Sequence, residues 1–128
     1  ISTCFDNVSG DLLVGRGGAP EGVLAAVALK CLGGYFEGYL TARNQEEIDR
    51  CHKMGVECDK IYKIDDLVKG DDAAFAATGV SHGELLDGVN YIEKNVATTE
   101  TLVLRAETGT VRFIQAKHYL DKKPEYAK

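Results

Sequence analysis

The stretch that decides the fold is Asp11-Leu-Leu-Val-Gly-Arg-Gly-Gly-Ala-Pro-Glu-Gly22, followed by an apolar run to Leu32. Residues 12–14 are typical of a short buried strand, and the glycines after them form a loop whose backbone can approach another group closely. Pro20 suits the first position of a helix, and the apolar run predicts that this helix is buried on nearly all sides. Glu21 therefore lies in its first turn, so the stretch is a strand–loop–helix candidate ligand site with a carboxylate built in.

The composition is that of a globular protein of ordinary charge. The chain has 128 residues, a net charge of −5 and 45% hydrophobic residues, which suffices for one α/β domain with a core. No basic stripe is present, which argues against nucleic-acid binding, and the longest apolar run is too short for a membrane span. The four cysteines lack CxxC spacing, so we expect reduced thiols in a cytoplasmic protein. The start, without Met or a signal-peptide pattern, suggests part of a larger polypeptide.

Strand character recurs along the rest of the chain. Four short stretches have it: residues 35–40, 60–64, 73–77 and 89–92. The small residues of 73–77 suit a central strand that is covered on both faces. Residues 98–106 and 111–118 predict a long hairpin, in whose turn Gly109 supplies a positive φ.

Two capping boxes predict helices between these strands. Asn44 with Glu47 begins a surface helix that runs to about Met54, and Ser81 begins a short helix in the same way. The predicted fold class is therefore α/β, a single domain over residues 1–128 with a mixed β-sheet and flanking helices. The sheet is expected to be parallel in its first part and antiparallel at its end.

The glycine loop suggests an anion as ligand. Only two glycines of the GxGxxG dinucleotide fingerprint are present, with Pro20 at its sixth position, so a nicotinamide-dependent dehydrogenase is only a third hypothesis. Backbone N–H groups at a helix N-terminus bind phosphate, and a divalent metal between the phosphate and Glu21 would remove their repulsion. Alternatively Glu21 offsets the helix dipole, which composition alone favours.

The remaining polar residues suggest no catalytic group. His52, His82 and His118 have no partner at a spacing typical of a site. The aspartate pairs 65–66 and 71–72 could be metal ligands, but caps and turns explain them with fewer assumptions. No catalytic residue is therefore assigned in this chain.

The sequence resembles the class II (GlpX-type) fructose-1,6-bisphosphatases. The resemblance begins at Gly17-Gly-Ala-Pro-Glu-Gly22 and continues in the same order through further blocks: residues 66–72, 75–80, 83–86, 97–102, 112–115 and 118–120. Together the blocks cover nearly the whole chain. The chain is thus similar to the C-terminal portion of such an enzyme, which implies the C-terminal half of a lithium-sensitive sugar-phosphatase-like fold.

The resemblance implies a cytoplasmic hydrolase of gluconeogenesis, dependent on Mn²⁺ or Mg²⁺, that converts fructose 1,6-bisphosphate to fructose 6-phosphate and phosphate. Some members also accept sedoheptulose 1,7-bisphosphate. It makes Glu21 a metal ligand and Gly18 a substrate contact, and it implies a homo-oligomer without nucleic-acid or membrane partners. The family's other metal ligands lie in the N-terminal half, so the chain alone is expected to be inactive and to need that half as its partner. The alternative is a non-catalytic α/β module that binds an anion or sugar phosphate, or serves in assembly.

Overall fold

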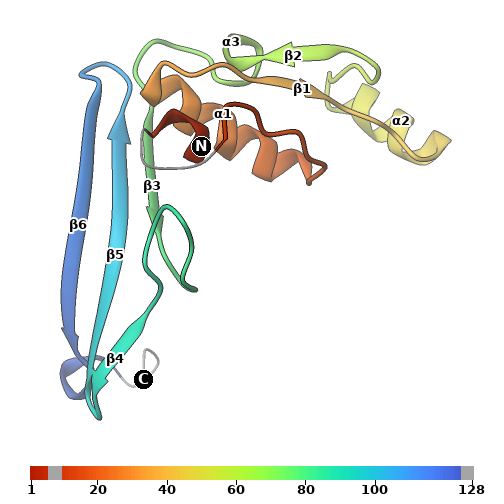
Figure 1. Cartoon of the computed structure of the whole chain (residues 1–128). Helices are drawn as coiled ribbons and strands as arrows, with labels where there is room; N and C mark the ends of the chain where they lie inside the picture. Colours follow the sequence, from red (N-terminus) through yellow and green to blue (C-terminus); the bar gives the residue numbers. More distant parts are fainter. Residues whose placement is uncertain (6–9, 125–128) are drawn as a thin grey trace.

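A computed structural model describes residues 1–5 and 10–124 of the chain. The helices and strands follow in the order α1 (Ala19–Leu32), β1 (Glu37–Tyr39), α2 (Gln45–Lys53), β2 (Ile61–Lys63), α3 (Ile64–Leu67), β3 (Ala74–Thr78), β4 (Asn90–Glu93), β5 (Val96–Arg105) and β6 (Thr110–Tyr119), with the 3-10 turns η1 (Ser2–Cys4) and η2 (Leu120–Lys122). The long β5–β6 hairpin stands at one side of the molecule, α1 lies in the middle, and α2 is farthest from the hairpin (Figure 1). Each strand predicted after residue 34 is found, with ends shifted by at most a few residues.

Strand β5 is the centre of the larger sheet. Strand β6 pairs with it over its whole length, while β3 and β4 share its other side. All these pairings are antiparallel, as is that of β1 with β2. The α/β class is confirmed, but the described residues contain no parallel pairing, so the predicted parallel part is wrong. Strand β3 is not central either, because β5 takes that place and leaves Ala74, Ala76 and Thr78 exposed.

The core lies between α1 and this sheet. It consists of Ala28 and Cys31 from the helix and of Leu102 and Leu104 from β5. The two leucines are fully buried, because residues two apart in a strand point to the same face. Partly buried side chains such as Phe75 of β3 pack around this cluster. This cluster therefore holds the C-terminal half of α1 against β5.

Helix α1 has well-defined ends. Gly18 is the N-cap, with φ −74° and ψ 158°, and Pro20 is the second helical residue and not the first. Gly33 ends the helix in the left-handed conformation, with φ 68°, as is common at helix C-termini. The predicted burial holds only for the C-terminal half, which contains the buried residues of the helix, while Val23 and Leu24 are exposed.

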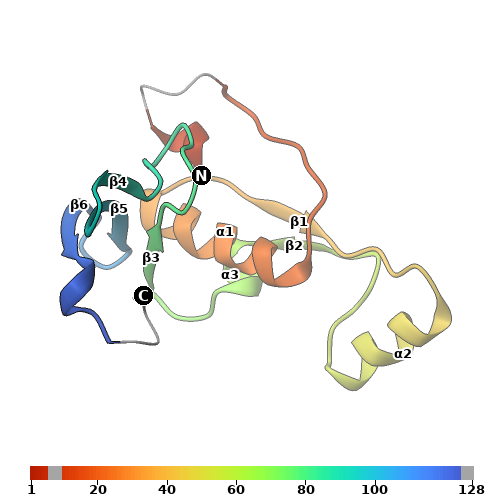
Figure 2. The same ribbon diagram turned by 90° about the horizontal axis from the view of Figure 1, so that it is seen from below.

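The predicted strand at residues 12–14 is absent, although these residues are within the described part of the chain. Leu12, Leu13 and Val14 are 82%, 78% and 87% exposed and pair with no strand. Figure 2 shows this segment arching away from the helices and strands on its way into α1. An apolar segment forms a strand only where it pairs with another strand, and none of the described strands pairs with this segment.

The predicted short helix after Ser81 is also wrong. Residues 79–88 form a compact loop in which the N–H of Gly83 donates to the carbonyl of Leu86 at 3.1 Å. The loop is closed so tightly that a Cβ at Gly79 would collide with the backbone of Asp87. The N–H of Asp87 also donates to the Glu100 carboxylate at 2.8 Å. These hydrogen bonds give the N–H groups of Gly83 and Asp87 acceptors that the backbone of a helix would otherwise provide.

Helix α2 begins as predicted. The Asn44 side chain accepts a hydrogen bond from the N–H of Glu47 at 2.9 Å, and the Glu47 carboxylate accepts from the N–H of Arg43 at 2.8 Å. Gly55 follows the helix with φ 71°. Over residues 1–5 and 10–124, the structure holds no helix that is both long and apolar enough to span a membrane.

Candidate functional site

The candidate site is formed by the end of the glycine loop and the first turn of α1. Glu21 is the third helical residue, and its carboxylate folds back over Gly18 so closely that a Cβ at Gly18 would collide with Oε2 of Glu21. The N–H of Gly22 donates to the carbonyl of Gly18 at 3.1 Å and closes the first turn. A side chain at Gly18 would therefore shift the Glu21 carboxylate, the flexible end of an exposed side chain, from its observed position.

The first turn of α1 can bind an anion at its backbone N–H groups and a cation at the Glu21 carboxylate. The N–H groups of Ala19 and Glu21 have no intrahelical acceptor in a helix that begins here, and Pro20 contributes no N–H. They are available to an anion, whose binding the helix dipole favours. The Glu21 side chain is exposed and offers oxygen ligands of the kind that Mg²⁺ and Mn²⁺ prefer. The structure thus brings together the two residues that the resemblance singles out, while their roles stay predictions.

Glu21 is not part of a larger ligand cluster in the part of the chain that the structure describes. Among residues 1–5 and 10–124, no group of three or more His, Cys, Asp or Glu side chains is placed to hold a metal ion. A magnesium ion has six oxygen ligands, several of them water. One carboxylate from this chain can therefore be only part of a metal site.

The other candidate acids have structural partners. Asp66 accepts a hydrogen bond from the N–H of Lys63 at 2.9 Å and so caps α3, and Asp65 pairs with Lys30 at 2.9 Å. Asp72 accepts two hydrogen bonds from the Arg105 guanidinium, at 3.2 and 2.8 Å. These bonds hold the pKa of the Asp72 carboxyl below its ordinary value. The predicted capping role is found for Asp66, whereas Asp65 and Asp72 are held in ion pairs with Lys30 and Arg105.

The three histidines lie on α2, on the loop after β3 and on β6. His52 is an exposed residue of α2. Nδ1 of His82 lies 3.3 Å from Oδ1 of Asp87 in an exposed pair, and Nε2 of His118 lies 2.9 Å from the Thr99 hydroxyl.

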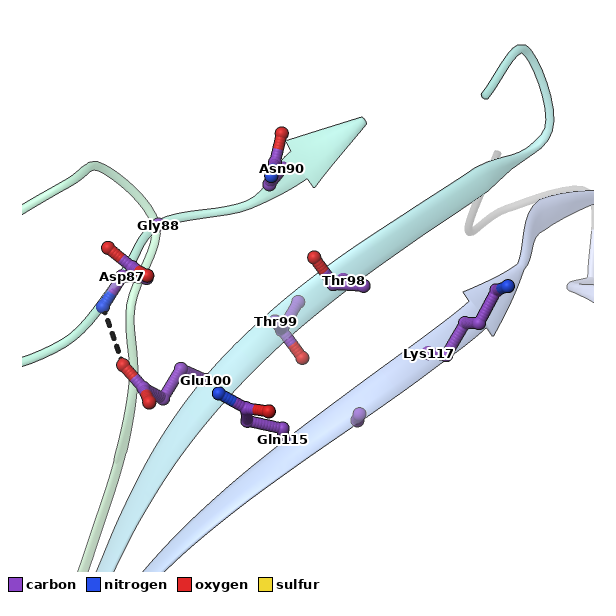
Figure 3. A pocket seen from close by; sticks show the side chains of 9 residues that line it. Asp87, Gly88, Asn90, Thr98, Thr99, Glu100, Gln115 and Lys117 are labelled. Carbon is purple, nitrogen blue, oxygen red and sulfur yellow. Dashed lines mark hydrogen bonds between the residues drawn. The ribbon is translucent and has the colours of Figure 1, made fainter. Parts of the chain in front are cut away.

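A polar pocket that the sequence did not predict lies on the sheet around β4. It has a volume of about 270 Å³, and its lining includes Thr98 and Glu100 of β5 opposite Lys117 and Gln115 of β6 (Figure 3). Thr98 and Glu100, like Gln115 and Lys117, are two apart in their strand, and the register pairs them across the hairpin, which places these four side chains on one face. The pocket carries charges of both signs and includes neither Gly18 nor Glu21.

The comparisons with known proteins agree on one family. The sequence model of the family described as bacterial fructose-1,6-bisphosphatase, glpX-encoded, matches residues 1–118. The chain is 40% identical to fructose-1,6-bisphosphatase 1 class 2 of Escherichia coli (strain K12), over 96% of this chain and 40% of that protein. It is 41% identical to the class 2 enzyme of Haemophilus influenzae, over 94% of this chain and 40% of that protein.

The chain therefore belongs to the glpX-encoded bacterial fructose-1,6-bisphosphatase family, as the motifs around Glu21 predicted. It spans about 40% of the length of the curated relatives that it matches.

Proposed function

We propose that this chain supplies part of the active site of a metal-dependent sugar bisphosphatase. The reaction is hydrolysis of the 1-phosphate of fructose 1,6-bisphosphate to fructose 6-phosphate and phosphate, a step of gluconeogenesis. The observation that carries the proposal is the family match, which includes the turn where the Glu21 carboxylate folds over Gly18. The relatives in Escherichia coli and Haemophilus influenzae are named for this substrate.

Each residue of the turn has a proposed role. Glu21 holds Mn²⁺ or Mg²⁺, which, when bound, polarises the phosphoryl group and lowers the pKa of a bound water. Gly18 contacts the substrate through its backbone, and the free N–H groups of the first turn are available to a phosphate oxygen. The dipole-offsetting role of Glu21 is compatible with these assignments, because a carboxylate in a first helical turn stabilises the helix in any case.

The rest of the site lies on other residues of the enzyme. We propose that a further part of the polypeptide, corresponding to the N-terminal half of the relatives, provides the remaining metal ligands and completes a lithium-sensitive sugar-phosphatase-like fold. This chain by itself is then inactive. Cytoplasmic location, self-association and use of sedoheptulose 1,7-bisphosphate as a second substrate belong to the same proposal.

The test is a chimera in which this chain replaces its matched segment in the Escherichia coli enzyme. We expect release of phosphate from fructose 1,6-bisphosphate that depends on Mn²⁺, and no release by this chain alone. Glu21→Gln should lower kcat/KM by a factor on the order of 10² or more, since it removes an anionic ligand from the metal. Glu46→Gln, on the surface of α2, is the matched control and should leave the rate unchanged.

A pair of glycine variants tests the turn itself. A Cβ at Gly18 collides with the Glu21 carboxylate, whereas a Cβ at Gly17 meets no atom within 4 Å. Gly18→Ala should therefore raise the Mn²⁺ concentration that gives half-maximal activity, and Gly17→Ala should not. An active chimera that is indifferent to Glu21→Gln would refute the metal assignment. An inactive chimera, with sugar-phosphate binding by this chain that survives Glu21→Ala, would instead support the non-catalytic module.

A further inference from the structure

The polar pocket beside β4 is built from parts of the fold that hold one another in place. The β5–β6 hairpin lines it, and β4 joins the hairpin by pairing Asn90 with Thr98. The loop before β4 contributes Gly88, which packs so closely on Ser81 that a Cβ at Gly88 would collide with the backbone of Ser81. The pocket is therefore formed before a ligand enters, as is usual for small-molecule sites.

One end of the pocket is acidic. Its lining includes Asp87 and Glu100, and Oε2 of Glu100 accepts a hydrogen bond from the N–H of Asp87 at 2.8 Å (Figure 3). This bond involves only one of the two carboxylate oxygens and fixes the position of the group. A carboxylate has several lone pairs that accept hydrogen bonds, and it bonds most strongly to a charged donor. This end of the pocket is therefore suited to an ammonium group.

Lys117 supplies a positive charge at the other end. In the hairpin register it lies opposite Thr98, whereas Glu100 lies opposite Gln115. Lys117 and Glu100 are thus diagonal neighbours, about 7–8 Å apart at their Cα atoms. The Lys117 ammonium lies 5.6 Å from the ring centre of Tyr119, which is two residues further along β6 from Gln115. Within residues 1–5 and 10–124, no ion pair joins Lys117 to Glu100, so neither charge neutralises the other.

Neutral polar side chains complete the lining. Thr98 and Gln115 are the other two corners of the square that Lys117 and Glu100 define on the hairpin, and Asn90 faces them from β4 (Figure 3). Hydroxyl and amide groups both donate and accept hydrogen bonds, as the N–H and C=O of a peptide group require. An extended dipeptide spans about 7 Å, which is close to the diagonal between the two charged residues.

We propose that this pocket binds a short peptide in its zwitterionic form. The ammonium group lies at Glu100, the peptide group at Gln115 and Thr98, and the terminal carboxylate at Lys117. A ligand with several negative charges is disfavoured, because Glu100 and Asp87 would repel it. The pocket includes neither Gly18 nor Glu21, so this binding is independent of the proposed phosphatase activity.

The experiment is a titration of the isotope-labelled 128-residue chain with glycylglycine, followed in two-dimensional amide NMR spectra. We expect saturable shifts of amides in the pocket, at residues 87–90, 98–100 and 115–117, with a Kd on the order of 1–10 mM. Glycylglycinamide lacks the carboxylate, and N-acetylglycylglycine lacks the ammonium group. Each of these capped peptides should bind about tenfold more weakly or worse, because it leaves one charge of the pocket without a partner.

Variants assign the two ends. Glu100→Gln removes the charge but keeps an acceptor for the N–H of Asp87, and Lys117→Met keeps most of the length of the side chain. Each should weaken glycylglycine binding by about tenfold or more. Glu93→Gln and Lys94→Met remove the same charges outside the pocket lining and are the matched controls, which should bind like the parent chain.

Several results would overturn the proposal. They are the absence of saturable shifts with glycylglycine, shifts confined to residues outside the pocket, and capped peptides that bind as tightly as glycylglycine. Binding that is unchanged in Glu100→Gln and in Lys117→Met would overturn it as well. The spectra of both variants also report whether each is folded, so a loss of binding is not confused with unfolding.

Discussion

Truncation of Leu102 should be among the most damaging single changes to this fold. Its side chain is fully buried at the centre of β5 and packs in the cluster with Ala28, Cys31 and Leu104. It is paired with Ala77 on β3 and Phe113 on β6, so it lies where three strands and α1 meet. The surrounding strands are held by their own hydrogen bonds, and they can close only part of the cavity that Leu102→Ala creates.

The size of the effect follows from the atoms that are lost. Leu102→Ala removes three carbon atoms from the core, worth about 2.4 kcal/mol at about 0.8 kcal/mol for each buried group. The remaining cavity adds to this cost, so the free energy of unfolding should fall by about 3–4 kcal/mol. Leu12→Ala makes the same chemical change on a side chain that is 82% exposed, and it should cost less than about 0.5 kcal/mol.

Urea-induced unfolding of the two variants and the parent chain measures this difference. The chain has no tryptophan, so far-UV circular dichroism is the suitable signal. With a slope of about 1–3 kcal/mol per M of urea, Leu102→Ala should lower the midpoint by about 1–4 M. If the two variants differed by less than about 1 kcal/mol, the packing described here for α1 on β5 would be wrong.

Three further predictions concern local structure. Asn44→Ala should destabilise the chain by about 1 kcal/mol, because it leaves the N–H of Glu47 uncapped, and Asn44→Asp should largely preserve the thermal midpoint. Gly109 has φ 58° in the β5–β6 turn, so Gly109→Ala should cost about 1–2 kcal/mol in urea unfolding, and Gly109→Asn less. The pKa of Asp72 is below its ordinary value of 3.8 in the folded chain, so its ion pair with Arg105 contributes stability above that pH. The contribution is lost as the pH falls through the lowered pKa. Asp72→Asn should therefore flatten the acid side of a plot of the free energy of unfolding against pH. An unchanged plot would contradict the role of the pair.

Local chemistry made much of the fold predictable. Helix α1 lies between the proline near its start and the glycines after Leu32, and α2 begins at the Asn44–Glu47 capping box. Both are predictable because capping satisfies backbone groups within a few residues. The hairpin of β5 and β6 follows from two apolar segments around Gly109. The motif around Glu21 predicted the family, and its place in the first helical turn follows from the same local signals.

The tertiary structure decided what depends on partners distant in the sequence. Residues 12–14 have the composition of a strand, but a strand needs a pairing partner, and no described strand pairs with this segment. The order of the sheet, with β5 at its centre and β3 beside it, is likewise a matter of long-range pairing. The position of the Glu21 carboxylate against Gly18 depends on how the first turn of α1 closes, which sequence spacing alone does not specify.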